Sequence, residues 1–197
     1  FLKDQNAELT IENSAFKEEA RKNEIIKTEL NSDIWQKNRP ANKKFIVADV
    51  LGRDPLNFGQ YLLIDKGEKD GLALNLAVTK AGGILVGKIS EIYLSYSKVL
   101  LITDTNSLVN VVSQKNRASG LLKGKNGALF LEMISQADRI EQGEIILTSG
   151  AGNAFPNGLI VGEVEKIFAT DVDVFKKAEI QPAFNDKDLE IVFVVSE

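Results

Sequence analysis

The chain has 197 residues, of which 44% are hydrophobic, and its formal net charge is −4. This length can hold one large domain, or two small domains with an extension. The acidic balance and the lack of a dense basic block argue against nucleic-acid binding as the main activity, because that binding needs a basic face to offset phosphate charge. The sequence contains neither cysteine nor histidine, which excludes disulfides, thiolate metal sites, cysteine nucleophiles and a Ser-His-Asp hydrolase.

The start of the sequence shows no targeting signal. No apolar run reaches the roughly 18–20 residues of a membrane span, and no signal-peptide pattern opens the chain. The sequence begins inside a helical pattern and without an initiator methionine. We therefore expect it to be a piece of a longer protein.

Residues 1–39 are predicted to form one long helix. No glycine or proline interrupts them, and Pro40 ends the helix because the residue before a proline is steered away from helical geometry. Leucines and asparagines recur there with the seven-residue period of parallel two-stranded coiled coils. The predicted seam has d positions Leu2, Leu9, Phe16, Asn23 and Leu30, and a positions Asn6, Asn13, Ala20, Lys27 and Ile34.

The polar a positions of this seam predict a weak homodimer. The alternative is a single amphipathic helix that lies on its own domain. A fully helical segment would be roughly 55–60 Å long at 1.5 Å per residue, which is too long to pack usefully on a small domain. We therefore expect a projecting, dimerising coiled-coil stalk.

From Phe45 onward, apolar residues alternate with a period of two and glycines punctuate the runs, which predicts β-strands. Twelve strands are expected, in two sets of six with similar spacing. The first set is Lys44–Leu51, Gln60–Lys66, Ala77–Lys80, Ile84–Ile92, Lys98–Thr103 and Leu108–Gln114. The second set is Ala118–Lys123, Ala128–Ile134, Glu144–Thr148, Leu159–Ile167, Ala178–Gln181 and Leu189–Val195.

Three matches in the same order indicate that the two sets are copies of one unit. They comprise a shared Gly-x-x-Val-Gly pattern, a shared Val-x-Val-Val-Ser pattern and a glycine-bearing acidic turn before each third strand. The matched pairs are Gly83–Ile92 with Gly158–Ile167, Val109–Ser113 with Val192–Ser196, and Gly67–Gly71 with Glu141–Gly143. Duplication is therefore the favoured interpretation.

Six short strands with glycine bends in each copy fit a small barrel better than a flat sheet, since closure removes exposed strand edges. The predicted fold is mainly β. It has an N-terminal coiled-coil helix at 1–39, a six-stranded β-barrel at 42–115 and a second six-stranded β-barrel at 116–197. The lack of a long helix between strands disfavours a parallel α/β sheet. In a double barrel the last strand can pair back onto the first unit. The division near residue 115 can therefore separate the two units in the sequence without separating them in the structure.

Two glycine-rich stretches superficially resemble nucleotide-binding loops. Gly120–Asn126 is one residue short between its glycines for a phosphate loop, and Asn126 stands where Ser or Thr should contact magnesium. Gly150-Ala-Gly152 lacks the third glycine of a dinucleotide fingerprint, and the following Pro156-Asn-Gly158 excludes the helix that would hold a pyrophosphate. We expect no cofactor.

Candidate catalytic groups are sparse. Ser149 lies in a glycine-rich turn, but no histidine is present to activate it, so only a Ser-Lys pair is formally possible. A small hydroxyl that satisfies loop backbone groups is the expected role. No Asp/Glu cluster has a recognisable metal spacing, and Asp65, Asp104 and Asp186 at strand ends are expected to cap turns. We expect neither a metal site nor catalytic residues.

Aromatic residues near the predicted loops, such as Tyr93, Tyr96, Phe168 and Phe175, are expected to pack the barrel ends. Phe155 differs from them because it lies inside an otherwise polar loop. It either anchors that loop to a core or presents an apolar contact to a partner. Anchoring is the favoured interpretation.

The stretch from Thr148 to Gly162, here called the signature loop, resembles the signature of the MreC family of rod shape-determining proteins. The matching residues are Thr148, Ser149, Gly150, Gly152, Phe155, Pro156, Gly158, Leu159 and Gly162. Leu100–Asp104, Gly120–Gly124, Leu189–Val192 and the leading helix also agree with the family, in the same order. The resemblance therefore covers essentially the whole chain.

This resemblance implies a non-enzymatic scaffold of the machinery that builds lateral peptidoglycan during cell elongation. It implies a protein with a short cytoplasmic tail, one transmembrane helix, a coiled-coil stalk and two six-stranded barrels on the extracytoplasmic, periplasmic side of the inner membrane. The implied partners are MreD, the MreB system, the polymerase RodA and its class B penicillin-binding transpeptidase. The implied role is to organise and activate these synthases by binding.

Two other classes of function stay open on the residues alone. A serine peptidase on a double barrel would need a Ser-Lys mechanism at Ser149. A periplasmic adaptor of an export complex also joins coiled coils to β modules. Such adaptors usually carry helical hairpins flanked by β segments on both sides, whereas the predicted helix occurs only at the N-terminus.

Overall fold

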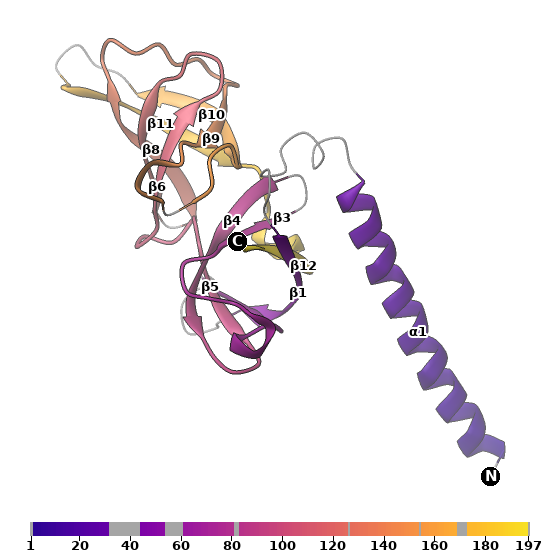
Figure 1. The fold of residues 1–197 in the computed structure, drawn as a ribbon. Coiled ribbons are helices and arrows are strands. Elements are labelled where there is room, and N and C mark those ends of the chain that lie inside the picture. Colours follow the sequence, from indigo (N-terminus) through magenta and orange to yellow (C-terminus); the bar gives the residue numbers. More distant parts are fainter. Residues whose placement is uncertain are drawn as a thin grey trace.

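The computed structural model describes residues 2–31, 44–53, 61–80, 83–125, 127–153, 155–168 and 173–196. Figure 1 shows one long N-terminal helix beside a two-part β region. The helix α1 spans Leu2–Leu30. The strands are β1 (Lys44–Arg53), β2 (Tyr61–Ile64), β3 (Ala77–Lys80), β4 (Ile84–Ile92), β5 (Ser97–Leu101), β6 (Leu108–Ser113), β7 (Ser119–Lys125), β8 (Ala128–Ser135), β9 (Ile145–Thr148), β10 (Ile160–Phe168), β11 (Phe175–Pro182) and β12 (Ile191–Ser196). The mainly β fold class is confirmed, with the twelve strands in the predicted order.

The strands close into two six-stranded barrels. In the first barrel each strand pairs with two others, in the cyclic order β12–β1–β2–β5–β4–β3. In the second barrel the cyclic order is β6–β7–β8–β11–β10–β9. One parallel pairing, between Ile160 and Ile84, joins β10 to β4 and so connects the barrels. Each ring of described strands is closed, which leaves it without a free sheet edge.

The two barrels exchange their last strands. β12, at the end of the chain, pairs with β1 and β3 of the first barrel. The last strand thus pairs back onto the first unit, as a double barrel allows. β6 pairs with β7 and β9 and thus lies in the second barrel, whereas a division at residue 115 groups it with the first. The alternation of apolar residues identifies a strand but does not specify its neighbours, which accounts for this difference.

The repeated Gly-x-x-Val-Gly pattern marks equivalent positions in the two barrels. Gly87 lies in β4 and faces β5, and Gly162 lies in β10 and faces β11. A Cβ atom at either glycine would lie 2.1 Å from a carbonyl oxygen of the facing strand, that of Leu100 or that of Gln181. A side chain would block this close approach of two backbones, so the pattern encodes the same barrel bend twice.

The backbone around these glycines repeats as well. The pairing of β4 with β5 shifts register just after Ile89, and the pairing of β10 with β11 shifts just after Val164, the residue that the glycine pattern aligns with Ile89. The N–H of Ile89 donates to the carbonyl of Leu76 at 2.9 Å, and that of Val164 donates to the carbonyl of Glu144 at 2.9 Å. Matching bulges and matching bonds support the duplication.

The last third of α1 packs on the outer face of the first barrel. The contact cluster consists of Ile25, Ile26 and Leu30 of the helix with Phe45, Val47, Ile191 and Phe193 of the barrel. Lys22 pairs with Asp49 at 2.5 Å, and Arg21 pairs with Glu190 at 2.7 Å. Because all four charged side chains are at least a third exposed, these pairs orient the helix more than they stabilise it.

The first part of α1 extends away from the barrels, and its N-terminus lies far from the second barrel (Figure 1). The first part of the helix therefore projects (Figure 1) and its last part packs on its own domain, and the pairing of two such helices stays a prediction. In the described residues, no helix is both long and apolar enough to span a membrane.

Candidate functional site

The predicted seam of α1 is uncovered in the single chain. Leu9 and Phe16 are 54% and 64% exposed. The polar and small seam residues Asn6, Asn13, Ala20, Asn23 and Lys27 are exposed as well. Leu30 is half-buried against the first barrel. Ile34 and the side chain of Leu2 lie outside the described residues.

The seam residues Leu9 and Phe16 lie on the face of α1 opposite to Ile25, whereas Leu30 belongs both to the seam and to the barrel contact. Leu9 and Phe16 are seven residues apart and share one face, because a turn takes 3.6 residues. Ile25 follows Phe16 by about two and a half turns and so points to the opposite side, where it meets the first barrel. Packing on the barrel therefore leaves the first part of the seam available to another helix and occupies the seam at Leu30.

One polar seam side chain, Asn13, and the neighbouring Thr10 are hydrogen-bonded within their own helix. The side-chain amide of Asn13 donates to the carbonyl of Leu9 at 2.9 Å, and Thr10 Oγ1 donates to the carbonyl of Asn6 at 2.7 Å. Such local bonds satisfy polar groups while the helix is unpaired. A paired helix would bury the Asn13 amide or redirect it, so this residue limits the strength of pairing.

The signature loop is closed at its base by Thr148, which is fully buried. Its Oγ1 donates to the carbonyl of Pro156 at 2.5 Å and accepts from the N–H of Leu159 at 2.9 Å. Its backbone N–H donates to the carbonyl of Leu159, and its carbonyl accepts from the N–H of Gly158. Removing the hydroxyl would leave buried polar groups without partners, which is costly. Thr148 therefore holds the two ends of the loop together.

The glycines of the signature loop serve its backbone geometry. Gly150, Gly152 and Gly158 have φ angles of 74°, 75° and 87°, in the left-handed region that other residues disfavour. A Cβ atom at Gly150 would also lie 3.0 Å from the Cβ of Asn157. Gly162, the last residue of the signature loop, permits the close approach of β10 and β11 described above.

Phe155 packs into the barrel core and is almost completely buried. Its side chain is 6% exposed and belongs to the main hydrophobic cluster. Ser149 is engaged locally, since its Oγ accepts from the N–H of Ala151 at 3.2 Å and its own N–H donates to the carbonyl of Asn110 on β6. Within the described residues no lysine is hydrogen-bonded to Ser149, and the loop residues Thr148, Ser149 and Phe155 all bond or pack within the barrel.

Glu144, just before β9, is a buried carboxylate that no sequence motif identifies. Its oxygens accept from the backbone N–H groups of Lys115, Asn116 and Glu141 at 2.7–3.2 Å, and from the Asn116 side-chain amide at 3.0 Å. Burial raises the pKa of Glu144, but hydrogen bonds from Asn116, Ser113 and Glu141 more than offset it, so the pKa lies below its ordinary value. The acidic turn before β9 is the one signal that the sequence offered for this structural group.

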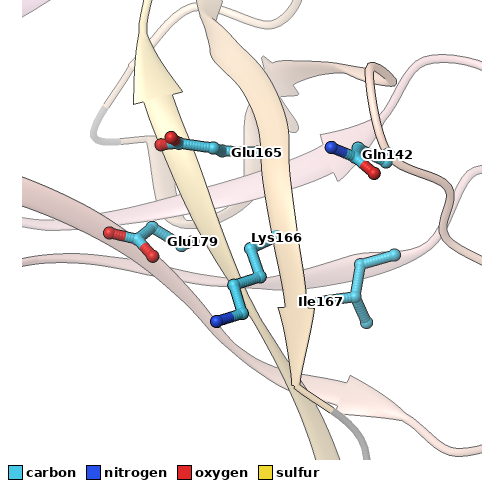
Figure 2. A pocket seen from close by; sticks show the side chains of 5 residues that line it. All are labelled: Gln142, Glu165, Lys166, Ile167 and Glu179. Carbon is cyan, nitrogen blue, oxygen red and sulfur yellow. The ribbon is translucent and has the colours of Figure 1, made fainter.

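An open depression lies where β10 and β11 meet the turn before β9. It has a volume of about 530 Å³ and is lined by Gln142, Glu165, Lys166, Ile167 and Glu179. Figure 2 shows the charged groups of Glu165, Glu179 and Lys166 on one side of the β10 ribbon, with Gln142 and Ile167 on the other. Since its polar groups do not converge, the depression lacks the geometry of a ligand site. In the part of the chain that is described, no cluster of His, Cys, Asp or Glu could hold a metal ion.

A smaller hollow, of about 230 Å³, lies on the outer face of the second barrel. We call it the lysine hollow; its lining consists of Lys123, Lys125, Phe130, Glu132, Phe168 and Lys177. Lys177 and Glu132 form a largely exposed ion pair at 3.4 Å, and the Lys166 ammonium lies 5.0 Å from the centre of the Phe168 ring. Aromatic rings and several cations therefore meet at this point.

Four aromatic residues that were expected to pack the barrel ends are partly exposed instead. Tyr93, Tyr96, Phe168 and Phe175 are 38–43% exposed. Tyr93 and Tyr96 stack on each other with ring centroids 4.4 Å apart. At this exposure the four side chains lie at the barrel surface and do not fill its interior. Composition alone does not reveal this exposure of aromatic rings.

The chain matches, over residues 50–196, the family described as rod shape-determining protein MreC, barrel core. The cell shape-determining protein MreC of Bacillus subtilis is 34% identical over 165 residues, which cover 78% of this chain and 57% of that protein. The chain thus spans little more than half the length of this curated relative.

Solved structures share the fold. A structure of MreC from Listeria monocytogenes matches 99% of this chain and 93% of its own, with a TM-score of 0.73 and 27% identity. A complex between the penicillin-binding protein PBP2 and MreC from Helicobacter pylori contains a similar chain, with a TM-score of 0.65 and 21% identity. That match covers 79% of this chain and 98% of the other, and it shows a common fold.

Proposed function

This chain belongs to the MreC family of rod shape-determining proteins, and we propose that it is the extracytoplasmic part of a non-enzymatic scaffold that organises and activates peptidoglycan synthases during elongation. The observation that carries the proposal is the match of the family's barrel core to residues 50–196, which include almost all of both barrels. The signature loop supports a non-enzymatic role, because Thr148, Ser149 and Phe155 bond or pack within the barrel.

The proposed location is the inner membrane, with a single transmembrane helix before α1 and the barrels on the extracytoplasmic side. Membership of the family supports this location. In that arrangement α1 sets the distance between the membrane and the barrels. Its 29 residues extend about 43 Å at 1.5 Å per residue, so the barrels could reach partner domains well above the lipid surface.

The helix also joins two copies in a parallel homodimer through the seam. The exposure of Leu9 and Phe16 on the face opposite Ile25 supports this, because an isolated apolar stripe gains from pairing. Replacing Asn6 and Asn13 by Ile should strengthen association, since these polar a positions weaken the seam. Sedimentation equilibrium of the unmodified chain and of the variant measures the dissociation constant of each dimer. A monomeric unmodified chain at high concentration, or an unchanged dissociation constant in the variant, would contradict the seam.

The proposed partners are MreD, the MreB system, RodA and the class B penicillin-binding transpeptidase. The relative from Helicobacter pylori that occurs in a complex with PBP2 supports the last of these. A scaffold that tethers two synthases raises their effective concentration to about millimolar for short linkers. Activation follows if the scaffold binds the active conformation of a synthase better than the inactive one and so shifts its population.

Complementation of cell shape tests the proposal. In the bacterium that encodes this chain, the full-length gene would be depleted and restored in two forms, one unchanged and one that ends after α1. We expect rods with the unchanged gene and rounded cells with the shortened one, because the barrels hold the synthases. Cells without the barrels that stay rod-shaped and incorporate wall precursor at the normal rate would refute the proposal.

A further inference from the structure

The internal repeat identifies equivalent outer faces on the two barrels. Asp49 of β1 pairs with Ile191 of β12, and Lys123 of β7 pairs with Leu108 of β6. These pairs are equivalent because Ile191 and Leu108 directly precede the repeated Val-x-Val-Val-Ser pattern. In the first barrel α1 covers this face. In the second barrel Leu108 is 53% exposed, so the equivalent face is open in the chain as described.

The charge of this face is opposite in the two barrels. Asp49 accepts a hydrogen bond from Lys22 of α1 at 2.5 Å, and this bond raises the pKa of Lys22. Lys123 takes the place of Asp49 in the second barrel, and Lys125 and Lys177 line the same hollow beside it. A segment that covered the second barrel as α1 covers the first would therefore carry carboxylates where α1 carries a lysine.

The lysine hollow offers such a segment a place for an apolar anchor. Phe130 lies opposite Lys123 and on the outward side of β8, between the buried Leu129 and Leu131. Phe168 is 41% exposed. The volume of about 230 Å³ lies below the range of roughly 300–1,000 Å³ for small-molecule pockets and suits a single side chain of a partner. An aromatic pocket with a polar rim is typical of the centre of a protein interface.

We propose that the lysine hollow and the adjoining β6–β7 face bind an acidic segment with one apolar anchor, carried by the penicillin-binding protein partner. This inference rests on the proposed function, since it names the surface through which the scaffold holds a synthase. The apolar side chain enters between Phe130 and Phe168, and the carboxylates meet Lys123, Lys125 and Lys177. The buried anchor supplies most of the affinity, and the charges speed association and fix the orientation.

Two variants test this surface. Phe168→Lys removes one wall of the hollow, and the pair Lys123→Glu with Lys177→Glu reverses its charge. All three side chains are exposed, so both variants should fold. The matched control is Tyr93→Lys, because the repeat aligns Tyr93 with Phe168 and Tyr93 is similarly exposed, at 39%. Each protein would be titrated against the purified penicillin-binding protein of the same bacterium by biolayer interferometry at low and high salt, after circular dichroism has verified its fold.

We expect each hollow variant to weaken binding at least tenfold, while Tyr93→Lys binds like the unmodified chain. Salt should weaken binding of the unmodified chain but not of the charge variant, whose hollow repels carboxylates. Folded hollow variants that bind normally would overturn the inference and leave the proposed function standing. An unmodified chain that does not bind at all would remove the proposed function itself. The same proteins would be sedimented with anionic phospholipid vesicles and tested for self-association. If the hollow variants lost only vesicle binding, the surface would be assigned to lipid. If they lost only self-association, it would be assigned to a second copy. Either result would overturn the inference.

Discussion

The two barrels are built alike but differ in what their outer faces hold. They share a cyclic strand order, a glycine that admits a facing carbonyl, and a bulge at the aligned position. The face formed by β1 and β12 is covered by the chain's own helix, whereas none of the described segments covers the face of β6 and β7, where Leu108 is 53% exposed. The repeated residues therefore encode the scaffold, and the residues that differ, such as Phe193 against Asn110, encode the surface of each barrel.

The barrels also differ in one connection. The link from β3 to β4 runs from Lys80 to Ile84, and the equivalent link from β9 to β10 runs from Thr148 to Ile160. The longer link is the signature loop, with Thr148 at its base and Phe155 in the core. Because Thr148 joins its ends and Phe155 packs in the core, the loop is a fixed part of the second barrel.

The strand exchange predicts the largest effect. Ending the chain at Glu190 removes β12, whose residues 191–195 are buried and which closes the first barrel between β1 and β3. The first barrel should unfold and release α1, while the second barrel, which contains β6, should stay folded. Hydrogen exchange followed by mass spectrometry should find protection lost in β1–β5 and kept in β6–β11. Equal protection in both barrels would contradict the claim that β12 belongs to the first barrel alone.

The paired glycines predict a large and equal loss in the two barrels. Gly87→Val and Gly162→Val each force a side chain against a facing carbonyl oxygen, which should cost about 3 kcal/mol or more. Thermal melting by circular dichroism would report both losses, with the helical signal of α1 retained after Gly162→Val. The control is Gly52→Ala, because a Cβ at Gly52 meets nothing within 4 Å. Should either valine variant melt like the unmodified chain, the two bends would not be equivalent.

Lowering the pH should destabilise the second barrel through Glu144, by less than the glycine substitutions do. Glu144 occupies the position of Leu76 in the repeat, so the second barrel has a carboxylate that the first lacks. The pKa of Glu144 is lowered in the folded protein. Its contribution to stability is therefore present above the usual glutamate pKa of about 4.3 and is lost as the pH falls through the lowered value.

Urea unfolding at a series of pH values measures this contribution. Glu144→Gln should be about 1–2 kcal/mol less stable than the unmodified chain at neutral pH, because it weakens the hydrogen bonds to the 115–116 turn. The two proteins should converge on acidification, as the unmodified carboxylate takes up its proton. Parallel curves over the whole range would mean that Glu144 does not supply the acid sensitivity.

Local patterns in the sequence predicted the strands and the glycine bends. Apolar alternation or short apolar runs located all twelve strands, because strands such as β9 bury one face and strands such as β12 bury both. The Gly-x-x-Val-Gly echo predicted equivalent bends, and Gly87 and Gly162 indeed make the same close approach. The favoured interpretation of Phe155 as an anchor agrees with its burial. Each of these features depends on a few neighbouring residues.

Features that depend on closure could not be predicted in this way. The lysine hollow draws residues from β7, β8, β10 and β11, which become neighbours only when the second barrel closes. β12 pairs in the first barrel and β6 in the second. Alternation does not encode which strands pair, so it could not predict this exchange. The packing of α1 depends on Ile25 and Ile26, which lie off the seven-residue seam and therefore gave no coiled-coil signal.

The central claim is that this chain activates a wall synthase by binding it, and the most direct measurement is the rate of peptidoglycan polymerisation. The polymerase and its transpeptidase would be reconstituted in liposomes from the same bacterium, with and without the full-length scaffold. The account predicts a faster rate with the unmodified scaffold and no acceleration with a scaffold that ends after α1. Equal rates under all three conditions would contradict it.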